Sequence, residues 1–441
     1  MTYQLICGAE IHVELKTKTK MFCGCKNDPF HAKEPNIYTC PVCLGLPGGL
    51  PVPNKQAIED TILLGLALHC EIPEFSHFDR KHYFYPDLPK GYQISQKDEP
   101  LCQGGYVDTS YGRVRLNHIH LEEDAAKMHH ATVDGKQVSL IDYNRSSVAL
   151  VEIVTEPDIH SPEQAKEFLK KVRDIIRSLG ISDCDMEKGT MRLEANISLA
   201  RQPSRPGLEG LPNYKVEVKN INSFRYFANS LTTEYARHAE ILDRGETPVQ
   251  ETRGYRADTG TTVSQRIKED AADYRYFPDP DIPPLVISRE WVEQIKSRLP
   301  ELPSTKIDNL ISLGIVESAA KVLVANQEMM DYLDQVKNLD SKAVVQAAKD
   351  LVNKKIDYQK LTPKDYLKSL RAKSADKITD EAILKPIIAK ILEDNPSVVA
   401  DYKAGKQNAL GFFVGAVMRA TAGKADPSIV NQILKRSMPQ A

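Results

Sequence analysis

The sequence predicts an α+β protein in which a strand-rich body precedes a helical C-terminal part, and three observations support this. Short runs of β-branched and aliphatic residues recur up to about residue 289, as in LICGAEIHVEL, RVRLNHIHLEE, VALVEIVTEP, GTMRLEANISL and YKVEVKNIN. The Pro-rich segment FPDPDIPP at 277–284 ends this region, because proline neither continues a helix nor fits a central strand. Helical periodicity dominates from residue 289 onward.

The helical patterns divide the rest of the chain. They cover, in order, residues 55–68, 162–179, 289–333, 410–418 and 427–436. The last begins at an Asp-Pro start signal, and the basic segment 354–377 predicts either a linker or an exposed helix. We therefore expect three domains: a body at 1–290, a helical domain at 291–376 and a small helical tail domain at 377–441.

Length and composition agree with a folded protein of several domains. The chain has 441 residues, of which 41% are hydrophobic and 27% are charged. No apolar run approaches the ~18 residues that a membrane helix needs. The N-terminus has neither the basic nor the apolar region of a signal peptide. We therefore expect a cytoplasmic protein that makes no membrane contact.

The charge is distributed unevenly. Residues 354–441 contain 16 Lys or Arg and 9 Asp or Glu, a net charge of +7, whereas the first 353 residues carry −9. A basic end on an acidic body favours contact with a polyanion through that end alone. A solvated, Lys-rich helix face is an equally good explanation of the same charges.

Four of the eight cysteines cluster. Cys23 and Cys25 form one close pair, and Cys40 and Cys43 form a second pair a short distance along the chain. Two such pairs can complete a closed site of four sulfurs around a tetrahedral ion, so we predict a structural Zn²⁺ site in a loop at residues 20–45. A disulfide or buried free thiols are the alternatives. A reducing compartment disfavours the first, and the surrounding Gly, Asn and Pro disfavour the second.

Charged residues alternate with apolar ones along four of the β-type runs, and a fifth run carries a single glutamate. Alternation is typical of an antiparallel sheet with one polar face, and solvent exposure explains most of these residues taken singly. Taken together, they predict a concave, charged sheet. The residues on the polar face are Glu10, His12 and Glu14; His118, His120, Glu122 and Asp124; Glu152; Arg192, Glu194, Asn196 and Ser198; and Lys215, Glu217 and Lys219.

Glu152 is the most informative of these residues. It stands alone among aliphatic neighbours in VALVEIV, where a carboxylate is costly unless it is paired or bound to a metal. So many carboxylates favour Mg²⁺ among them, with Mn²⁺ tolerated because a histidine is present. The chain has neither a P-loop nor a G-x-G-x-x-G motif, so metals, Lys and Arg would have to hold any ATP.

The same segments resemble the B subunit of the aspartyl/glutamyl-tRNA amidotransferases. The matching stretches run in order from residue 8 to residue 284, and the tail GFFVGAVMRATAGKADPSIVNQILK is also similar. The stretches are GAEIHVELKTKTKMFCGC, FDRKHYFYPDLPKGYQISQ, HLEEDAAK, LVEIVTEPD, MRLEANIS, VEVKNINSFRY, QETRGY and DYRYFPDPDIPP. The middle helical part resembles the family less and is shorter.

The resemblance implies a fold and an activity. The body would be a cradle related to the glutamine synthetase and guanido kinase fold, followed by a helical domain and a tRNA-binding tail. The enzyme would be a ligase that uses ATP to phosphorylate Glu on tRNA(Gln), Asp on tRNA(Asn), or both. Ammonia from a glutaminase partner, the amidase or A subunit, would then displace phosphate, and the small C subunit would complete a heterotrimer.

The resemblance also implies the roles of individual residues. The metal ligands of the kinase site fall on Glu10, His12, Glu122 and Glu152, which the pattern of charges also singles out, and Glu123 is the close rival of Glu122. The four cysteines match the zinc site of many family members. Weaker candidates for contacts with phosphate, substrate or ammonia are Lys81, Arg192, Glu194 and Lys219.

Other functions remain open from the sequence alone. A free-standing ligase of glutamine synthetase type would need no tRNA and would leave the basic tail without a role. The related E-type protein carries a large inserted domain for which 441 residues leave no room. A zinc-stabilised RNA-binding module without catalysis would use the carboxylates only to solvate a sheet.

Overall fold

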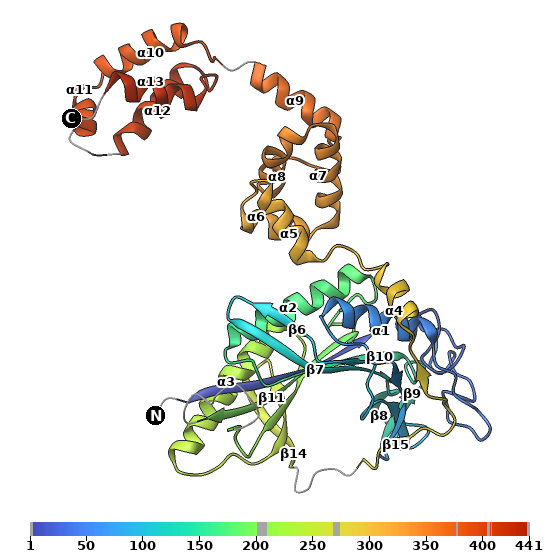
Figure 1. The fold of residues 1–441 in the computed structure, drawn as a ribbon. Coiled ribbons are helices and arrows are strands. Elements are labelled where there is room, and N and C mark those ends of the chain that lie inside the picture. Colours follow the sequence, from blue (N-terminus) through green and yellow to red (C-terminus); the bar gives the residue numbers. More distant parts are fainter. Residues whose placement is uncertain are drawn as a thin grey trace. The chain divides into compact units, whose positions relative to one another are not determined.

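The computed structural model describes residues 3–200, 210–267, 274–375, 378–403, 406 and 408–438. The chain forms two compact units, Met1–Pro303 and Ser304–Ala441. The first unit contains all the described strands together with four α-helices, and the described part of the second unit is helical (Figure 1). The mixed α+β class predicted from the sequence is confirmed.

A large twisted sheet forms the centre of the first unit. Its strands lie in the order β14-β13-β12-β11-β1-β10-β7-β5, and β6 pairs with β7. All the described pairs of this sheet are antiparallel except β12 with β13, which is parallel. The strands are β1 (Gln4–Glu14), β5 (Cys102–Gln103), β6 (Tyr106–Thr109), β7 (Gly112–Glu123), β10 (Ala149–Thr155), β11 (Met191–Ala200), β12 (Val216–Ile221), β13 (Glu251–Arg256) and β14 (Thr261–Ile267).

Three helices pack against the apolar face of this sheet. They are α1 (Lys55–Ala67), α2 (Pro162–Leu179) and α3 (Phe224–Asp243), and the first two match the helices predicted from the sequence. Ser161 starts α2 by accepting a hydrogen bond from the backbone of Gln164, and Gly180 ends it in the left-handed conformation. Apolar side chains of all three helices join those of the strands in one core. The opposite, polar face is therefore left for the charged residues.

Smaller sheets border the large one. The sheet β15-β3-β4 joins β15 (Phe277–Pro278), β3 (Asp79–His82) and β4 (Tyr92–Ser95). β16 (Leu285–Val286) pairs with β2 (Phe75–Ser76), and β8 (Lys127–Val133) pairs with β9 (Lys136–Asp142). The Pro-rich segment thus supplies β15 at the edge of a small sheet, where proline removes no ladder hydrogen bond, and then turns at residues 280–282.

Helix α4 (Arg289–Lys296) closes the first unit. The indole N–H of Trp291 donates to Oε1 of Glu59 at 3.1 Å, and Arg298 lies 2.9 Å from the other oxygen of Glu59. Glu59 belongs to α1, so these contacts fix α4 against that helix. The first unit consequently extends through Pro303.

The second unit contains two separate clusters of buried apolar side chains. One cluster falls within residues 310–367 and the other within residues 384–438. Helices α12 and α13 match the two helices predicted near the C-terminus, and Asp426 caps α13 as expected. The helices are α5 (Pro303–Ser312), α6 (Glu317–Val324), α7 (Gln327–Leu339), α8 (Val344–Val352), α9 (Pro363–Ala375), α10 (Glu381–Glu393), α11 (Pro396–Lys403), α12 (Asn408–Ala420) and α13 (Pro427–Ser437).

Two short 3-10 helices complete the described elements. They are η1 (Pro29–His31), in the segment between the cysteine pairs, and η2 (Ser341–Ala343), which precedes α8.

Candidate functional site

The candidate site lies on the polar face of the large sheet, where four neighbouring strands bring ionisable residues into one row. His12 on β1 pairs in register with Glu152 on β10 and with Arg192 on β11, and Glu152 pairs in turn with His120 on β7. His12 and Glu152 are 140 positions apart in the sequence. Strand pairing, and not local sequence, therefore assembles this site.

His12, Glu122 and Glu152 form one compact cluster, in which the three ligand atoms all lie within 4.8 Å of one another. Nε2 of His12 lies 3.4 Å from Oε2 of Glu152 and 3.9 Å from Oε1 of Glu122. Nε2 of His120 lies 3.2 Å from the same oxygen of Glu152 and 3.5 Å from Oε2 of Glu122. An imidazole and two carboxylates at this spacing suit a hard divalent cation such as Mg²⁺ or Mn²⁺.

The charges of this cluster stabilise one another. Burial alone would lower the pKa of His12, but Glu152 and Glu122 raise it to about 9, and the same two carboxylates raise the pKa of His120 to about 9. Burial would raise the pKa of Glu152, yet the two imidazoles hold it well below its ordinary value. Protonated imidazoles thus balance the carboxylates, and a divalent cation would supply the same balance.

The structure separates Glu122 from Glu123. Glu122 points into the cluster and accepts a hydrogen bond from the hydroxyl of Ser95 at 3.2 Å. Glu123 instead accepts a hydrogen bond from the backbone N–H of Ile94 at 3.0 Å and lies 2.5 Å from Nζ of Lys90. Of these two neighbours, Glu122 is the one that shares a group with His12 and Glu152.

Glu10 belongs to an adjoining group with Glu194 and Glu217, whose carboxylate oxygens also lie within 4.8 Å of one another. Asn196 donates a hydrogen bond to Glu10 at 2.8 Å. Nζ of Lys219 lies 3.0 Å from Glu194 and 3.3 Å from Glu217. Burial and the neighbouring carboxylates raise the pKa of Glu10. Three of the four predicted metal ligands thus share one cluster, and the fourth lies in the group beside it.

Arg192 faces a third group of charges. One of its terminal nitrogens donates to Oδ2 of Asp124 at 2.8 Å, and Arg145 lies 3.7 Å from the same oxygen. Glu14 also belongs to this group, since burial and Asp124 raise its pKa to about 8. Arg192 is therefore next to His12 in register, but its guanidinium pairs with a carboxylate outside the cluster.

Lys81 brings a positive charge to the cluster from the small sheet. Burial would lower the pKa of its ammonium group, but Glu122, Tyr276 and Glu152 raise it. Its Nζ also lies 5.3 Å from the ring centre of Tyr274. A largely buried ammonium close to two carboxylates is suited to pairing with a phosphate group that enters between them.

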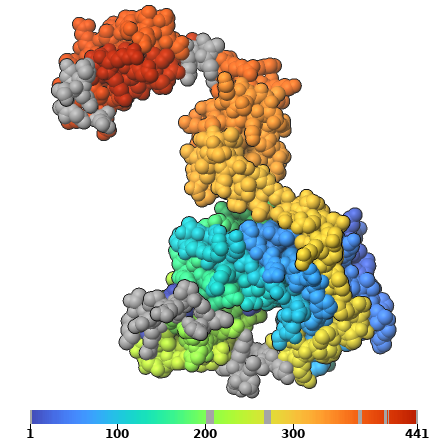
Figure 2. Space-filling model, viewed as in Figure 1, coloured from blue at the N-terminus to red at the C-terminus, as the bar shows by residue number. Residues whose placement is uncertain are grey.

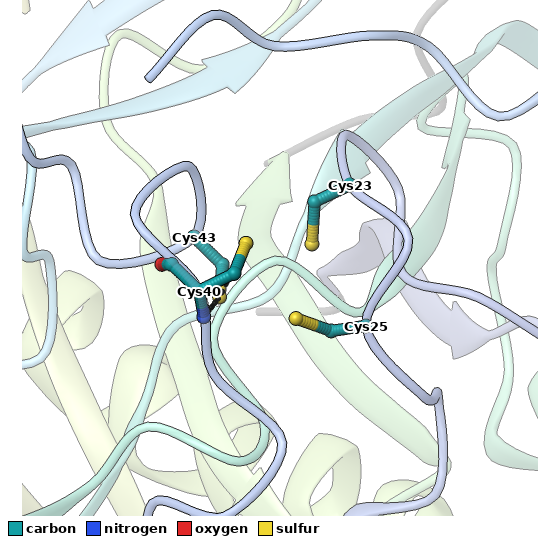
Figure 3. Close-up of side chains that lie close together, drawn as sticks. All are labelled: Cys23, Cys25, Cys40 and Cys43. Carbon is teal, nitrogen blue, oxygen red and sulfur yellow. Dashed lines mark hydrogen bonds between the residues drawn. The ribbon is translucent and has the colours of Figure 1, made fainter. Parts of the chain in front are cut away.

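The four predicted cysteines come together in the segment that follows β1. Their sulfurs point toward one another from two loops, one carrying Cys23 and Cys25 and the other Cys40 and Cys43 (Figure 3). The sulfurs of Cys40 and Cys43 are 3.8 Å apart, close to the spacing of about 3.8 Å that Zn–S bonds of about 2.3 Å give in a tetrahedron. All four thiols are free, and together they could hold a metal ion.

A buried lysine stands beside this cysteine group. Lys20 is fully buried, its Nζ lies 3.9 Å from the sulfur of Cys43, and it donates a hydrogen bond to the carbonyl of Tyr143 at 3.1 Å. A hydrogen bond with Cys23 and the charge of Lys20 lower the pKa of Cys43 to about 5, although burial opposes this. The segment with these loops lies on the outer surface of the first unit (Figure 2, blue). At Cys43 the electrostatics favour thiolate, the form that binds metals, whereas the pKa values of Cys23 and Cys25 are raised.

Comparison with known proteins identifies the family. A family model described as the GatB/GatE catalytic domain matches residues 5–293, and one described as the GatB domain matches residues 320–438. The B subunit of the aspartyl/glutamyl-tRNA(Asn/Gln) amidotransferase of Thermotoga maritima is 42% identical over an alignment of 483 residues that covers 99% of each chain.

The chain belongs to this B-subunit family.

Other relatives agree. Proteins with the same name from Dehalococcoides mccartyi and Thermomicrobium roseum are 42% and 40% identical and cover 99% and 100% of this chain, in each case over 99% of their own length. The family predicted from the sequence motifs is confirmed. These relatives are named as one subunit of a larger enzyme, so partner subunits belong to the family description. No described helix has both the length and the apolar character needed to cross a membrane.

Several residues that the structure places at the site have no role that the sequence predicts. His120 contacts both carboxylates of the cluster, and Glu217 completes the group around Glu10. Both residues lie on polar faces that the alternation of polar and apolar residues predicted, so the sequence indicated their direction. Ser95 and Tyr276 carried no such signal, because their short strands and loops show no periodicity. Their proximity to Glu122 becomes visible only in the folded chain.

Proposed function

We propose that this chain is the B subunit of a glutamine-dependent tRNA amidotransferase, an ATP-dependent carbon–nitrogen ligase. It phosphorylates the side-chain carboxylate of Glu on tRNA(Gln), of Asp on tRNA(Asn), or of both, and then replaces the phosphate with ammonia. The observation that carries the proposal is the cluster of His12, Glu122 and Glu152 beside Lys81, in a chain of the B-subunit family.

Two steps are needed because a carboxylate does not react with ammonia at a useful rate. First, a carboxylate oxygen of the aminoacyl group attacks the γ-phosphorus of ATP, the bond to the bridging oxygen breaks, and ADP leaves. Ammonia then attacks the acyl carbon, and inorganic phosphate leaves with the electron pair of the C–O bond, while one proton of the ammonia is lost. Phosphoryl transfer of this kind depends mainly on positioning and charge neutralisation.

The residues of the cluster fit the Mg²⁺ ion that such a reaction requires. His12, Glu122 and Glu152 would hold it, with the carboxylate of Glu10 in the adjoining group, and Mn²⁺ would be tolerated because a histidine takes part. When bound, the cation neutralises phosphate oxygens. Lys81, whose ammonium interacts with Glu122 and Glu152, would pair with the same phosphate group.

The charged groups beside the cluster would bind the other reactants. We assign Lys219 and Glu194 to the aminoacyl group or to ammonia, since their charges are paired and lie next to Glu10. Arg192 could bind a phosphate group only if its guanidinium broke its hydrogen bond with Asp124. We assign a structural role to Zn²⁺ at the four cysteines, because four sulfurs leave no ligand position for a substrate.

Partners follow from the chemistry. The chain lacks a Ser-rich amidase signature, so a glutaminase partner must supply the ammonia, which is the role of the A subunit, with the small C subunit completing a heterotrimer. We propose that the basic residues 377–441 bind the tRNA and that the body has the cradle fold related to glutamine synthetase and guanido kinases. The antiparallel strands of the large sheet support that fold assignment.

The decisive experiment uses the assembled enzyme. Replacing Glu152 with Gln keeps the shape of the side chain but removes its charge, so we expect tRNA-dependent ATP cleavage to be lost while the glutaminase activity of the partner persists. Glu240→Gln is the matched control, because the carboxylate of Glu240 lies on α3, is 74% exposed and pairs with Arg244 outside the cluster. Normal ATP cleavage by the Glu152→Gln enzyme would refute the proposal.

A further inference from the structure

A line of hydrogen bonds runs along β7 to the metal cluster. The side-chain amide of Asn117 donates to Oε1 of Glu156 at 2.7 Å, and its Oδ1 lies 2.7 Å from Nδ1 of His118. Nε2 of His118 lies 3.1 Å from Nδ1 of His120. Nε2 of His120 then faces the carboxylates of Glu122 and Glu152, at 3.5 and 3.2 Å.

The first partner in this line fixes where the protons lie. A carboxylate only accepts, so Glu156 orients the amide of Asn117 with its oxygen toward His118. Nδ1 of His118 must therefore donate, and in a neutral imidazole this leaves Nε2 as an acceptor. His120 consequently donates from Nδ1, and a hydrogen bond from its Nε2 to either carboxylate requires that this nitrogen carry a proton as well. Burial and the charge of His120 lower the pKa of His118 to about 4, which agrees with a neutral ring.

The packing of the two rings holds this geometry in place. The rings of His118 and His120 stack at 5.1 Å between centres and at an angle of 30°. The side chain of His120 is only 7% exposed. An imidazole with a fixed ring plane can orient carboxylates that bind a metal, which is how partners behind the direct ligands act in many metal sites.

We propose that His120 is a positioning residue that orients the carboxylates of Glu122 and Glu152 toward His12 for a divalent cation, and that His118 and Asn117 hold its ring in place. This inference rests on the proposed function and names a residue that acts behind the predicted ligands. Without the imidazole of His120, each carboxylate gains rotational freedom, so the ligand set must be reassembled when the cation binds.

The test measures Mn²⁺ binding to the full-length, zinc-loaded chain by calorimetry and by the electron paramagnetic resonance of free Mn²⁺. We expect His120→Ala to weaken the affinity about 10- to 100-fold and His118→Ala to weaken it less, within about tenfold. His120→Gln keeps a donor near the position of Nε2 and should recover most of the loss. His130→Ala is the matched control, because His130 is exposed and contacts Ser139 on the β8-β9 hairpin.

A second readout separates positioning from packing. In ATP cleavage by the assembled enzyme, His120→Ala should raise the Mn²⁺ concentration needed for half-maximal rate, with kcat near wild type at saturating Mn²⁺. A role confined to packing would lower the Tm of His120→Ala and His120→Gln alike and would leave their Mn²⁺ affinity at the wild-type value. That outcome overturns the inference alone. Absence of Mn²⁺ binding by the wild-type chain would overturn the proposed function together with it.

Discussion

The two units of this protein bury different kinds of side chain. The first unit buries many charged and polar side chains, including Lys20, Glu122, Asp124, Glu234 and His238. In the described part of the second unit, the buried side chains are apolar apart from Thr421 and the tyrosines Tyr332, Tyr366 and Tyr402. Burying a charge costs free energy unless the charge is paired, so the buried charges of the first unit lower its free energy of unfolding.

This difference indicates where each unit does its work. The proposed phosphoryl transfer would need charges that are arranged inside the fold of the first unit and shielded from water. In the second unit, the charges stay at the surface, where exposed lysines and arginines can meet a polyanion without desolvation inside the protein. A substitution of one charge should therefore have a large effect in the first unit and a small one in the second.

The largest expected effect concerns the neighbours Glu122 and Glu123. Glu122→Gln removes a carboxylate from the cluster, so the rate of ATP cleavage should fall on the order of 1,000-fold with little change in Tm. Glu123→Gln removes the partner of Lys90 and should lower the Tm but change the rate at saturating substrate less than tenfold. Steady-state kinetics and thermal unfolding check both variants. Equal rate losses in the two would contradict the separation of these residues.

Glu234 tests a buried charge that has no part in the chemistry. Its side chain is fully buried, and hydrogen bonds from His238, Arg237 and Thr262 lower its pKa to about 2 against the effect of burial. A lowered pKa stabilises the fold above the ordinary value near 4.5, and this contribution is lost as the pH falls toward 2. Glu234→Gln should therefore cost about 3 kcal/mol at pH 7.

Urea unfolding from pH 7 to pH 3 measures this cost, and the difference from wild type should shrink toward the acid end. Glu240→Gln is the control on the same helix, because its carboxylate is 74% exposed and pairs with Arg244. Its effect should stay below about 1 kcal/mol. A pH-independent difference for Glu234→Gln would show that packing, and not charge, is responsible.

The cysteine group should affect stability more than catalysis. Cys43→Ser should reduce bound zinc to well below one ion per chain and lower the Tm by about 5 °C, or roughly 2 kcal/mol. ATP cleavage at saturating Mg²⁺ should remain within about tenfold of wild type. Cys184→Ser, which changes a buried thiol outside the group, should leave the zinc content unchanged. Metal analysis measures the zinc content, and calorimetry measures the Tm. A full zinc content in the Cys43→Ser variant would rule out the site.

The smallest effect per residue is expected in the tail. Deleting residues 377–441 should weaken tRNA binding about tenfold and make the dependence of log Kd on log salt shallower, while the first unit keeps its Tm because its core is separate. Filter binding at several salt concentrations provides the measurement. An unchanged salt slope would show that the basic tail makes no contact with RNA.

For residues that are close in sequence, the prediction that they form one group or one helix is confirmed. The four cysteines lie within 21 positions, so chain connectivity alone keeps them near one another, and the structure brings their sulfurs together. Helices α1, α2, α12 and α13 were found from periodicity and capping signals for the same reason. The family followed from motifs that run in order along the body and was confirmed by relatives over 99% of the chain.

Residues that meet only through strand pairing were predicted less completely. Alternation placed Glu10, His12 and Glu122 on polar faces, but it could not show that Glu10 would join Glu194 and Glu217. It also gave no reason to prefer His120 to the many other charged residues on the same faces. The sequence of one strand alone determines to which face each side chain points. The offset between two paired strands depends on segments far apart in the sequence.

By itself, the sequence determined the class of the fold, the family, the cysteine group and the face on which each charged residue stands. Only the tertiary structure decided which of those residues share a site: Glu122 and not Glu123, with His120 behind it. The physical reason is the register of β1, β7 and β10, which hydrogen bonds between distant segments set and which the packing of the apolar face against three helices holds in place.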